Sequence, residues 1–312
     1  MSPTEPGAAA PPVYDVPGPR TDPAPLRDAS LRRGRALGRG SGLLRSELRT
    51  TFLRGRTLVM LAVLAAVPVL VGVAVRFETG GAEDGRAGAG PAFIAQVTHN
   101  GLFLVFTALA ATLPVFLPMA VGVVAGDAIA GEANSGTLRY LLVAPAGRVR
   151  LLLVKYAATL AFCLVATLTV AGSALAVGVL LFPLGEVTLL SGTTVPLPEG
   201  LVRAVAVAVA VAVSLVGVAA LGLFVSTLTN SGIAAMATTV GLVITVQILN
   251  AIPQLEMIQP YLFSHEWLSF ADLLRDPVEW GDLLNNFALQ GLYAAVFGSA
   301  AWARFTARDI TV

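Results

Sequence analysis

The amino-acid sequence predicts an all-α integral membrane protein with six transmembrane helices, preceded by an amphipathic helix at the membrane interface. Of the 312 residues, 56% are hydrophobic and 12% are charged, whereas ordinary soluble domains are about one-quarter charged. The mean hydropathy is +0.79. Six long apolar stretches each approach the roughly 20 helical residues that cross a hydrocarbon core of about 30 Å. These observations exclude a disordered or fibrous chain and argue against a soluble enzyme.

Charge and cysteine content restrict the chemistry further. The formal net charge is +1, from 20 basic and 19 acidic residues, so we expect no nucleic-acid partner. A single cysteine, Cys163, excludes an intrachain disulfide and a four-cysteine metal site. The two histidines, His99 and His265, are far apart, and no catalytic or metal-binding motif accompanies them. We therefore expect no cofactor in this chain.

Residues 1–42 differ in composition from the rest of the chain. Eight prolines fall within the first 25 residues, and the later part of the segment is rich in arginine. No apolar run of signal-peptide length occurs in it. We expect a disordered cytoplasmic tail, because it has too little apolar surface to offset the entropy of ordering, and we expect it to lie against anionic lipid headgroups.

The next segment, residues 43–56, has the pattern of an amphipathic helix. Leu44, Leu48 and Phe52 recur every fourth residue, and charged residues occupy the other sides of the helical wheel. Such a helix can lie in the plane of the membrane interface. A plain helical extension of the first span is an alternative interpretation of the same pattern.

Residues 57–312 form the predicted transmembrane domain. We expect helices because an open strand would leave backbone polar groups without partners in lipid. Residues 226–232 are a short polar cluster that predicts a tight turn between the fourth and fifth spans. Pro114 and Pro118 fall inside the second span and favour a kink there. The six predicted spans are residues 57–75, 102–125, 156–182, 204–228, 232–252 and 284–303.

Basic residues are distributed unevenly between the two sides of this topology. If the N-terminus is cytoplasmic, sixteen of the twenty Lys and Arg residues lie inside and four lie outside. The positive-inside rule then places both termini in the cytoplasm, in agreement with an even number of spans. Nineteen of the twenty basic residues are arginine, which, with abundant Ala, Val and Gly, indicates a high-GC bacterium. We therefore expect a multi-pass protein of the bacterial cell membrane.

The sequence contains no site that would power transport. The only lysine, Lys155, is not preceded by the glycine-rich turn of a nucleotide-binding P-loop. We expect it at the end of a span, with its amine reaching the headgroups. The six predicted spans contain no Asp, Glu, His, Lys or Arg, whereas ion-coupled carriers usually hold such residues at mid-membrane. Energy for any transport would then come from another protein.

The segment between the second and third spans, residues 127–150, is predicted to be cytoplasmic and amphipathic. Gly131 and a break at Pro145 bound a short helix in this prediction, and Glu132 falls near its N-terminal end, where a carboxylate is favoured. We expect Glu132 to be exposed, so that its replacement costs little folding stability. From the pattern alone, an ordinary interfacial loop helix accounts for the segment.

The same segment resembles the signature of ABC-2 type transporter permeases, which reads roughly D-x-x-x-x-E-x-x-x-G-T-L-x-x-L-L-x-x-P-x-x-R. The helix before the first span, the six spans, the Ser226-Thr227 exit of the fourth span and Arg308-Asp309-Ile310 agree with this family. The likeness covers about residues 42–312. The residues that it implicates in coupling to an ATPase are Asp127, Glu132, Gly136, Thr137, Leu138, Arg139, Leu141, Leu142, Pro145 and Arg148.

The resemblance implies a fold like that of type V exporters, and a homodimeric or heterodimeric permease. Separate ATP-binding cassette subunits would bind ATP and Mg and supply the energy, and Glu47 and Arg49 would also contact them. Two other functions remain as alternatives. A secondary, ion-coupled carrier is disfavoured by the absence of charge at mid-membrane, and an intramembrane enzyme lacks a nucleophile with a base or a metal site.

The predicted outer loop, residues 253–283, is long and rich in aromatic residues, whose rings favour the membrane interface. ABC-2 permeases carry short re-entrant helices in this position, and the resemblance therefore implies an outer gate that includes Trp267 and Phe270. A plain aromatic belt is the alternative interpretation.

Overall fold

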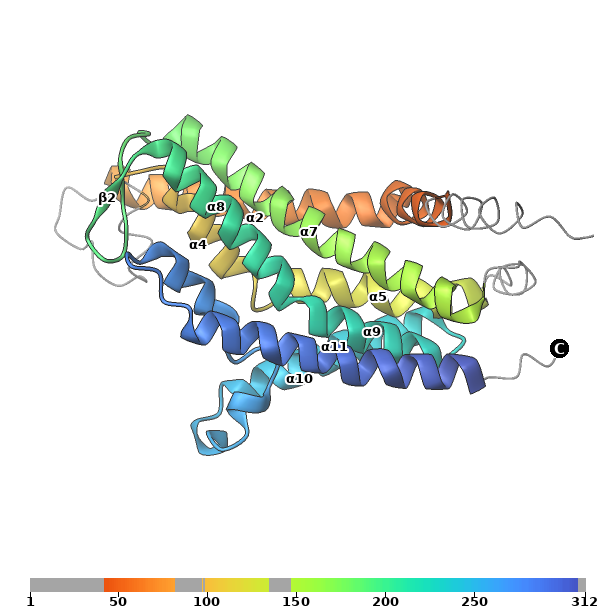
Figure 1. Cartoon of the computed structure of the whole chain (residues 1–312). Coiled ribbons are helices and arrows are strands. Elements are labelled where there is room, and N and C mark those ends of the chain that lie inside the picture. Colours follow the sequence, from red (N-terminus) through yellow and green to blue (C-terminus); the bar gives the residue numbers. More distant parts are fainter. Residues whose placement is uncertain (1–41, 82–96, 98, 135–146, 308–312) are drawn as a thin grey trace, which may run out of the picture. The chain divides into compact units, whose positions relative to one another are not determined.

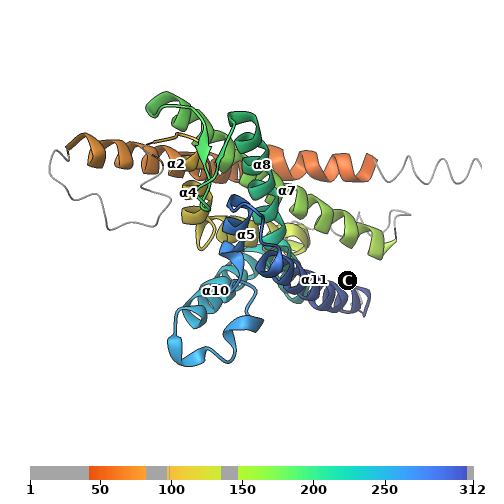
Figure 2. The ribbon, with the colours of Figure 1, turned by 60° about the vertical axis from the view of Figure 1, so that its left-hand side comes forward.

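A computed structural model describes residues 42–81, 97, 99–134 and 147–307, all within one compact unit of the chain (Figures 1 and 2). The predicted N-terminal tail, apart from Gly42, lies outside the described residues. So do Arg308-Asp309-Ile310 and seven of the motif residues, which are Gly136, Thr137, Leu138, Arg139, Leu141, Leu142 and Pro145.

The described part is mostly helical. It begins with a helical segment at residues 42–53. The longer helices that follow are α2 (Gly55–Gly81), α4 (Phe103–Thr112), α5 (Phe116–Asn134), α7 (Arg148–Leu181), α8 (Leu197–Ser214), α9 (Val216–Leu228), α10 (Gly232–Asn250) and α11 (Gly281–Ala307). Short 3-10 helices lie between α10 and α11 at η1 (Pro253–Leu255), η2 (Gln259–Tyr261) and η3 (Trp267–Leu274). Two short antiparallel strands, β1 (Val187–Thr188) and β2 (Thr194–Val195), pair Val187 with Val195 between α7 and α8.

Five stretches of the described chain are long and apolar enough to cross a membrane, so the protein is an α-helical membrane protein, as its composition predicts. The five are Gly55–Phe77, Phe116–Asn134, Arg148–Leu181, Leu197–Leu228 and Gly232–Asn250. The predicted sixth span, 284–303, is helical within α11. It is not among the five, because polar residues such as Asn286 and Gln290 lower its hydropathy.

The predicted span 102–125 is interrupted at Pro114, one of the two prolines expected to kink it, and is two helices. Helix α4 ends at Thr112 and α5 begins at Phe116, because Pro114 has no N–H for a helical hydrogen bond and its ring crowds the preceding turn. The carbonyl oxygen of Pro114 accepts a 2.6 Å hydrogen bond from Nε2 of Gln247 in α10. The stretch that is long enough to cross the membrane is therefore Phe116–Asn134, which includes the first part of the predicted coupling segment.

The predicted span 204–228 is also two helices, α8 and α9, with Leu215 between them. No proline causes this interruption. The backbone N–H of Gly217 donates a 3.2 Å hydrogen bond to Oε1 of Gln290 in α11. At each of the two interruptions, a glutamine side chain from a neighbouring helix thus forms a hydrogen bond with the backbone. Such a bond is expected inside a membrane, where lipid offers the backbone no hydrogen-bond partner.

Residues 42–53 continue from α2 with a single bend at Arg54 (Figures 1 and 2). The N–H groups of Thr57 and Leu58 both donate to the carbonyl oxygen of Arg54, so the first turn of α2 begins at the bend. This arrangement matches the interpretation of residues 43–56 as a helical extension of the first span. The ring of Phe52 lies 6.3 Å from that of Phe162, so the extension packs on α7.

Helices α5, α8 and α9 lie at the centre of the helical unit. Within an 18-residue apolar window of each candidate span, 67% of residues in α5 and 72% in α8–α9 are buried, against 22–28% in α2, α7 and α10. Helix α5 packs on α9 and α10, and α9 packs on α11. The outer helices instead expose large apolar side chains, such as Leu70 of α2 and Ile248 of α10, as a lipid environment requires.

The helix ends gather at two opposite ends of this unit (Figure 1). At one end, which we call the hairpin end, the β1–β2 pair lies beside the C-terminus of α7 and the N-terminus of α8. At the other end, which we call the charged end, lie residues 42–53, the C-termini of α5 and α11, and the N-terminus of α7. The two parts of the motif that are described, up to Asn134 and from Gly147, therefore belong to the charged end.

A contact between two glycines brings α7 against the residues that precede α4. A methyl group placed on Gly178 would collide with the backbone carbonyl oxygen of Gly101, and one on Gly101 would collide with the carbonyl of Gly178. The N–H of Gly101 donates to the carbonyl oxygen of Pro183 at 2.9 Å. No side chain other than hydrogen fits between these backbones.

We predict that Gly178→Ala lowers the free energy of unfolding by about 1–3 kcal/mol, because the new methyl group forces the two backbones apart. Gly172→Ala is the matched control in the same helix, since nothing lies within 4 Å of its methyl group. The control should change stability by less than about 1 kcal/mol. Thermal unfolding of the purified protein in detergent measures both, and equal midpoints would contradict the contact.

Candidate functional site at the charged end

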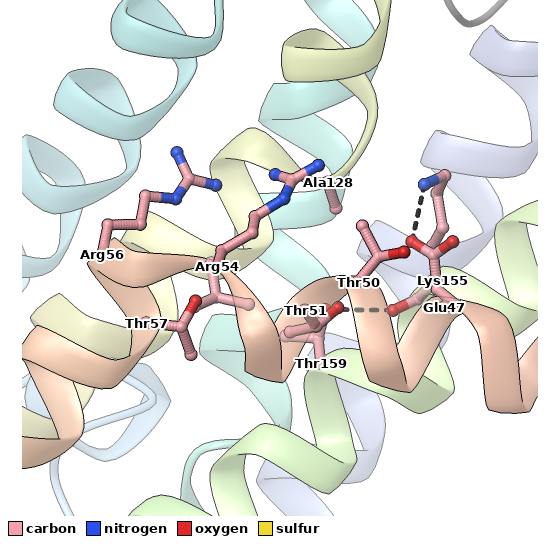
Figure 3. A pocket seen from close by; sticks show the side chains of 10 residues that line it. Glu47, Thr50, Thr51, Arg54, Arg56, Thr57, Ala128, Lys155 and Thr159 are labelled. Carbon is pink, nitrogen blue, oxygen red and sulfur yellow. Dashed lines mark hydrogen bonds and ion pairs between the residues drawn. The ribbon is translucent and has the colours of Figure 1, made fainter.

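Six charged side chains meet at the charged end, and we refer to them as the charged cluster. They come from residues 42–56, the second half of α5 and the first part of α7, and they are Glu47, Arg54, Arg56, Asp127, Glu132 and Lys155. Three are cationic and three are acidic. Figure 3 shows Arg54 and Arg56 reaching out on the same side of their helix, while Lys155 points at Glu47.

Asp127 is the centre of the first half of the cluster. Its side chain is 9% exposed, and its Oδ2 accepts a 2.6 Å hydrogen bond from Arg54 and a second one from Arg56. Because the helix bends at Arg54, Arg54 and Arg56 do not have the relative orientation of a regular helix. Both side chains reach the carboxylate of Asp127. The motif residue Asp127 is thus tied to the segment that precedes the first span.

Glycines make room for this carboxylate. A methyl group on Gly232, the first residue of α10, would lie 2.5 Å from Oδ1 of Asp127, and one on Gly131 would also collide with it. Asp127 therefore lies against the N-terminal end of α10, where the helix dipole favours a negative charge.

Lys155 is the centre of the second half of the cluster. Its residue is 2% exposed, and its Nζ donates to Oε1 of Glu47 at 2.8 Å and to Oε1 of Glu132 at 2.5 Å. The prediction that this lysine reaches the headgroups is wrong. Lys155 of α7 instead binds Glu47 of residues 42–53 and Glu132 of α5. A buried ammonium requires carboxylate partners of this kind.

The predicted exposure of Glu132 is also wrong. Gly131 does not begin a new helix, since α5 runs through this position as far as Asn134. Glu132 is 9% exposed, and the ammonium of Lys155 supplies the charge that compensates its burial. Its replacement is therefore expected to lower stability.

Ser226, near the end of α9, holds the same part of α5. Its Oγ accepts hydrogen bonds from the backbone N–H groups of Ile129 at 3.0 Å and Ala130 at 2.9 Å. Ser226 is completely buried. The sequence indicated this residue only as the exit of the fourth span, whereas the structure brings it to the helix that carries Asp127 and Glu132.

A small cavity opens between the two halves of the cluster (Figure 3). Its lining consists of Glu47, the three cations of the cluster, four threonines and two small apolar side chains. Its interior volume is about 20 Å³, which is enough for one water molecule or one oxygen atom of a ligand.

The other predicted site residues do not join the cluster. Arg49 is exposed, and Arg148 donates to the carbonyl oxygen of Thr306 in α11 at 3.0 Å. Trp267 and Phe270 lie in η3 and are 2% and 1% exposed, and the ring of Trp267 lies 5.5 Å from that of Phe263.

Two carboxylates of the segment between α10 and α11 are perturbed. Burial raises the pKa of Glu266 above its ordinary value of 4.5, and the charge of Asp282 raises it further, while His265 opposes both. Burial likewise raises the pKa of Asp272, against the lowering effect of Arg275. These groups belong to a different part of the structure from the charged cluster.

Sequence reasoning missed a buried polar network around the interruption between α8 and α9. Asn286 and Gln290 of α11 are each 1% exposed. Asn286 donates to Oγ of Ser214 at 2.7 Å, and Gln290 donates to the carbonyl oxygen of Phe263 at 2.7 Å and to Asn286 at 3.1 Å. The available signal was the i, i+4 spacing of two amides in an otherwise apolar stretch.

We predict that Lys155→Met lowers the free energy of unfolding by about 3–5 kcal/mol, because it leaves two buried carboxylates without their shared cation. Adding Glu132→Gln should restore part of this loss, since one of the two charges is then removed. Arg304→Met, at an exposed position of α11, is the control and should cost less than about 0.5 kcal/mol. Thermal unfolding in detergent measures the stability of the single, double and control variants. A Lys155→Met variant as stable as the control would contradict the ion pairs of Lys155.

Comparison with known proteins adds one match. The sequence has no match among curated proteins. Residues 92–311, which are more than two-thirds of the chain, match the model of a family described as "Protein of unknown function (DUF2705)". The matched region includes Asp127, Glu132 and Lys155 of the charged cluster. The chain therefore belongs to the DUF2705 family.

Proposed function

We propose that this chain is the membrane-spanning permease subunit of an ATP-binding cassette exporter of the ABC-2 type, powered by a separate ATP-binding subunit. The observation that carries the proposal is the attachment of the motif residues Asp127 and Glu132. Asp127 is paired with Arg54 and Arg56, and Glu132 is paired with Lys155 of α7, which also binds Glu47. Both motif residues are thus held at the charged end, where the partner ATPase would bind in this proposal.

The proposal includes six membrane crossings, with α11 as the sixth. Helix α11 has 27 residues, which is more than the roughly 20 that a crossing requires. Its most polar side chains, Asn286 and Gln290, are buried in hydrogen bonds, while Leu292, Val296 and Trp302 are exposed. A helix with its polar groups inward and its apolar groups outward can face lipid despite a modest average hydropathy.

The charged end is the cytoplasmic end in this proposal. Of the described basic residues, only three come from the opposite end: Arg76, Arg203 and Arg275. The charged end contains Arg45, Arg49, Arg54, Arg56, Arg148, Arg150, Lys155 and Arg304. The positive-inside rule favours this orientation, which places the C-terminus in the cytoplasm of a bacterial cell.

A secondary carrier is the second candidate, and one observation favours it. Asp127 and Glu132 are buried within Phe116–Asn134, a stretch that is able to cross the membrane. Buried carboxylates in membrane helices often serve proton or ion coupling. Their position in the second half of α5, with cations already paired to them, favours a structural role at the membrane boundary instead.

For orientation, we predict that the C-terminal residue and position 140 are cytoplasmic and that position 193 is external. The measurement is labelling of single cysteines by a membrane-impermeant maleimide in intact cells, in a Cys163→Ala background. The positive-inside count and the antiparallel helix arrangement give the expected result. Labelling at the C-terminus from outside would contradict six crossings with this orientation.

For energy supply, we predict that a tagged chain purified from its native host retains an ATP-binding cassette protein, and that ATP hydrolysis belongs to the complex and not to the chain alone. The chain has no P-loop lysine of its own. Proton-driven substrate uptake by the isolated chain in liposomes would instead establish the secondary carrier.

Gly136→Val should weaken retention of that ATPase by about tenfold, because a β-branched side chain prevents close backbone approach at the partner surface. Gly172→Val is the matched control, since nothing lies within 4 Å of a Cβ at Gly172. Membrane levels of both variants are compared by immunoblot. Equal retention of the ATPase by the two variants would contradict a role of the motif in docking.

A further inference from the structure

The cavity in the charged cluster offers more hydrogen-bond donors than the protein uses. Its lining includes the cationic groups of Arg54, Arg56 and Lys155 against a single carboxylate, that of Glu47. Of its four threonine hydroxyls, those of Thr50 and Thr159 already donate to backbone carbonyl oxygens. Nε of Arg56 is buried and has no hydrogen-bond partner within the part of the chain that the structure describes, so the arginine side of the cavity has fewer acceptors than donors.

Charge is divided unequally between the two halves of the cluster. Arg54 and Arg56 share the single carboxylate of Asp127, which leaves an excess of one positive charge on that side. Lys155 has two carboxylate partners, so its charge is more than balanced. An anion would therefore be attracted to the arginine side of the cavity.

The position of the arginines relative to the apolar surface identifies the source of the anion. Arg56 is the second residue of Gly55–Phe77, the apolar stretch of α2 that is able to cross a membrane. The exposed side chains of Leu58, Val59 and Val63 follow within two turns. The two arginine side chains are 38% and 37% exposed, so a group outside the protein can reach them at the level where lipid phosphates lie.

We propose that the cavity is a binding site for the phosphate of an anionic membrane phospholipid. One phosphate oxygen fits the volume of about 20 Å³, and the remaining oxygens accept at the mouth from the partly exposed guanidinium groups of Arg54 and Arg56. Charge-assisted contacts between guanidinium groups and phosphate are short and strong. The acyl chains would then lie along the exposed apolar side of α2. The site does not depend on the transport function proposed above.

The test uses the full chain purified in a non-ionic detergent and titrated with phosphatidylglycerol, with phosphatidylcholine or with sodium phosphate. Native mass spectrometry counts the bound molecules. We expect saturable binding of phosphatidylglycerol that exceeds that of phosphatidylcholine, and no saturable binding of inorganic phosphate. Arg56→Gln should weaken the binding of phosphatidylglycerol by about tenfold, because a charge-assisted contact is lost.

Arg49→Gln is the matched control, since it removes the same charge from an exposed position of the same segment and should leave binding within about twofold. Thr51→Val is a second variant that keeps every charge, removes one hydroxyl from the cavity and should weaken binding by about threefold or more. It keeps the test valid if Arg56→Gln does not fold. Equal losses from Arg56→Gln and Arg49→Gln would overturn the proposal, as would saturable binding of inorganic phosphate without a lipid preference.

Discussion

The ammonium of Lys155 is buried at the charged end and needs acidic hydrogen-bond partners there. A charge removed from water costs several kcal/mol unless carboxylates and good geometry compensate. Glu47 and Glu132 provide both, at 2.8 and 2.5 Å. Because these carboxylates come from different parts of the chain, the need of one cation fixes three segments against each other. Residues 42–53, α5 and α7 are thus joined at one buried ammonium.

At the interruptions of the helices, uncharged backbone groups also need hydrogen-bond partners. Lipid offers no hydrogen bonds, so a helix can break inside the bundle only where another side chain bonds the released backbone. Gln247 does this at Pro114, and Gln290 at Gly217. Each glutamine lowers the mean hydropathy of its own helix. Gln290 contributes to the low hydropathy of α11, which is not among the five described stretches that are apolar enough to cross a membrane. The polarity of α11 is thus a consequence of the break in its neighbour.

The fold class and most helix positions could be predicted because length and hydropathy are local properties. The break at Pro114 was foreseeable from proline chemistry, whereas the one at Leu215 depends on an amide that is distant in sequence. The motif residues Asp127 and Glu132 were identified, but their burial was not. The sequence predicts an exposed Glu132 because Gly131 and Pro145 have the pattern of the two ends of a short loop helix. The partner of Glu132, Lys155, lies 23 positions later, and no local pattern pairs these two residues.

The two interruptions also divide the packing of the unit. The halves near the hairpin end, α4 and α8, pack mainly on α7. Near the charged end, α5 packs mainly on α9 and α10, and α9 packs mainly on α11 and α5, while both also contact α7. Helix α7 is the longest of the described helices and runs unbroken past both interruptions, over 34 residues and about 50 Å. It carries Lys155 near one end and Gly178 near the other. One continuous helix therefore holds the buried ion pairs and the glycine contact at a fixed separation, whereas its neighbours are interrupted at Leu215 and at residues 113–115.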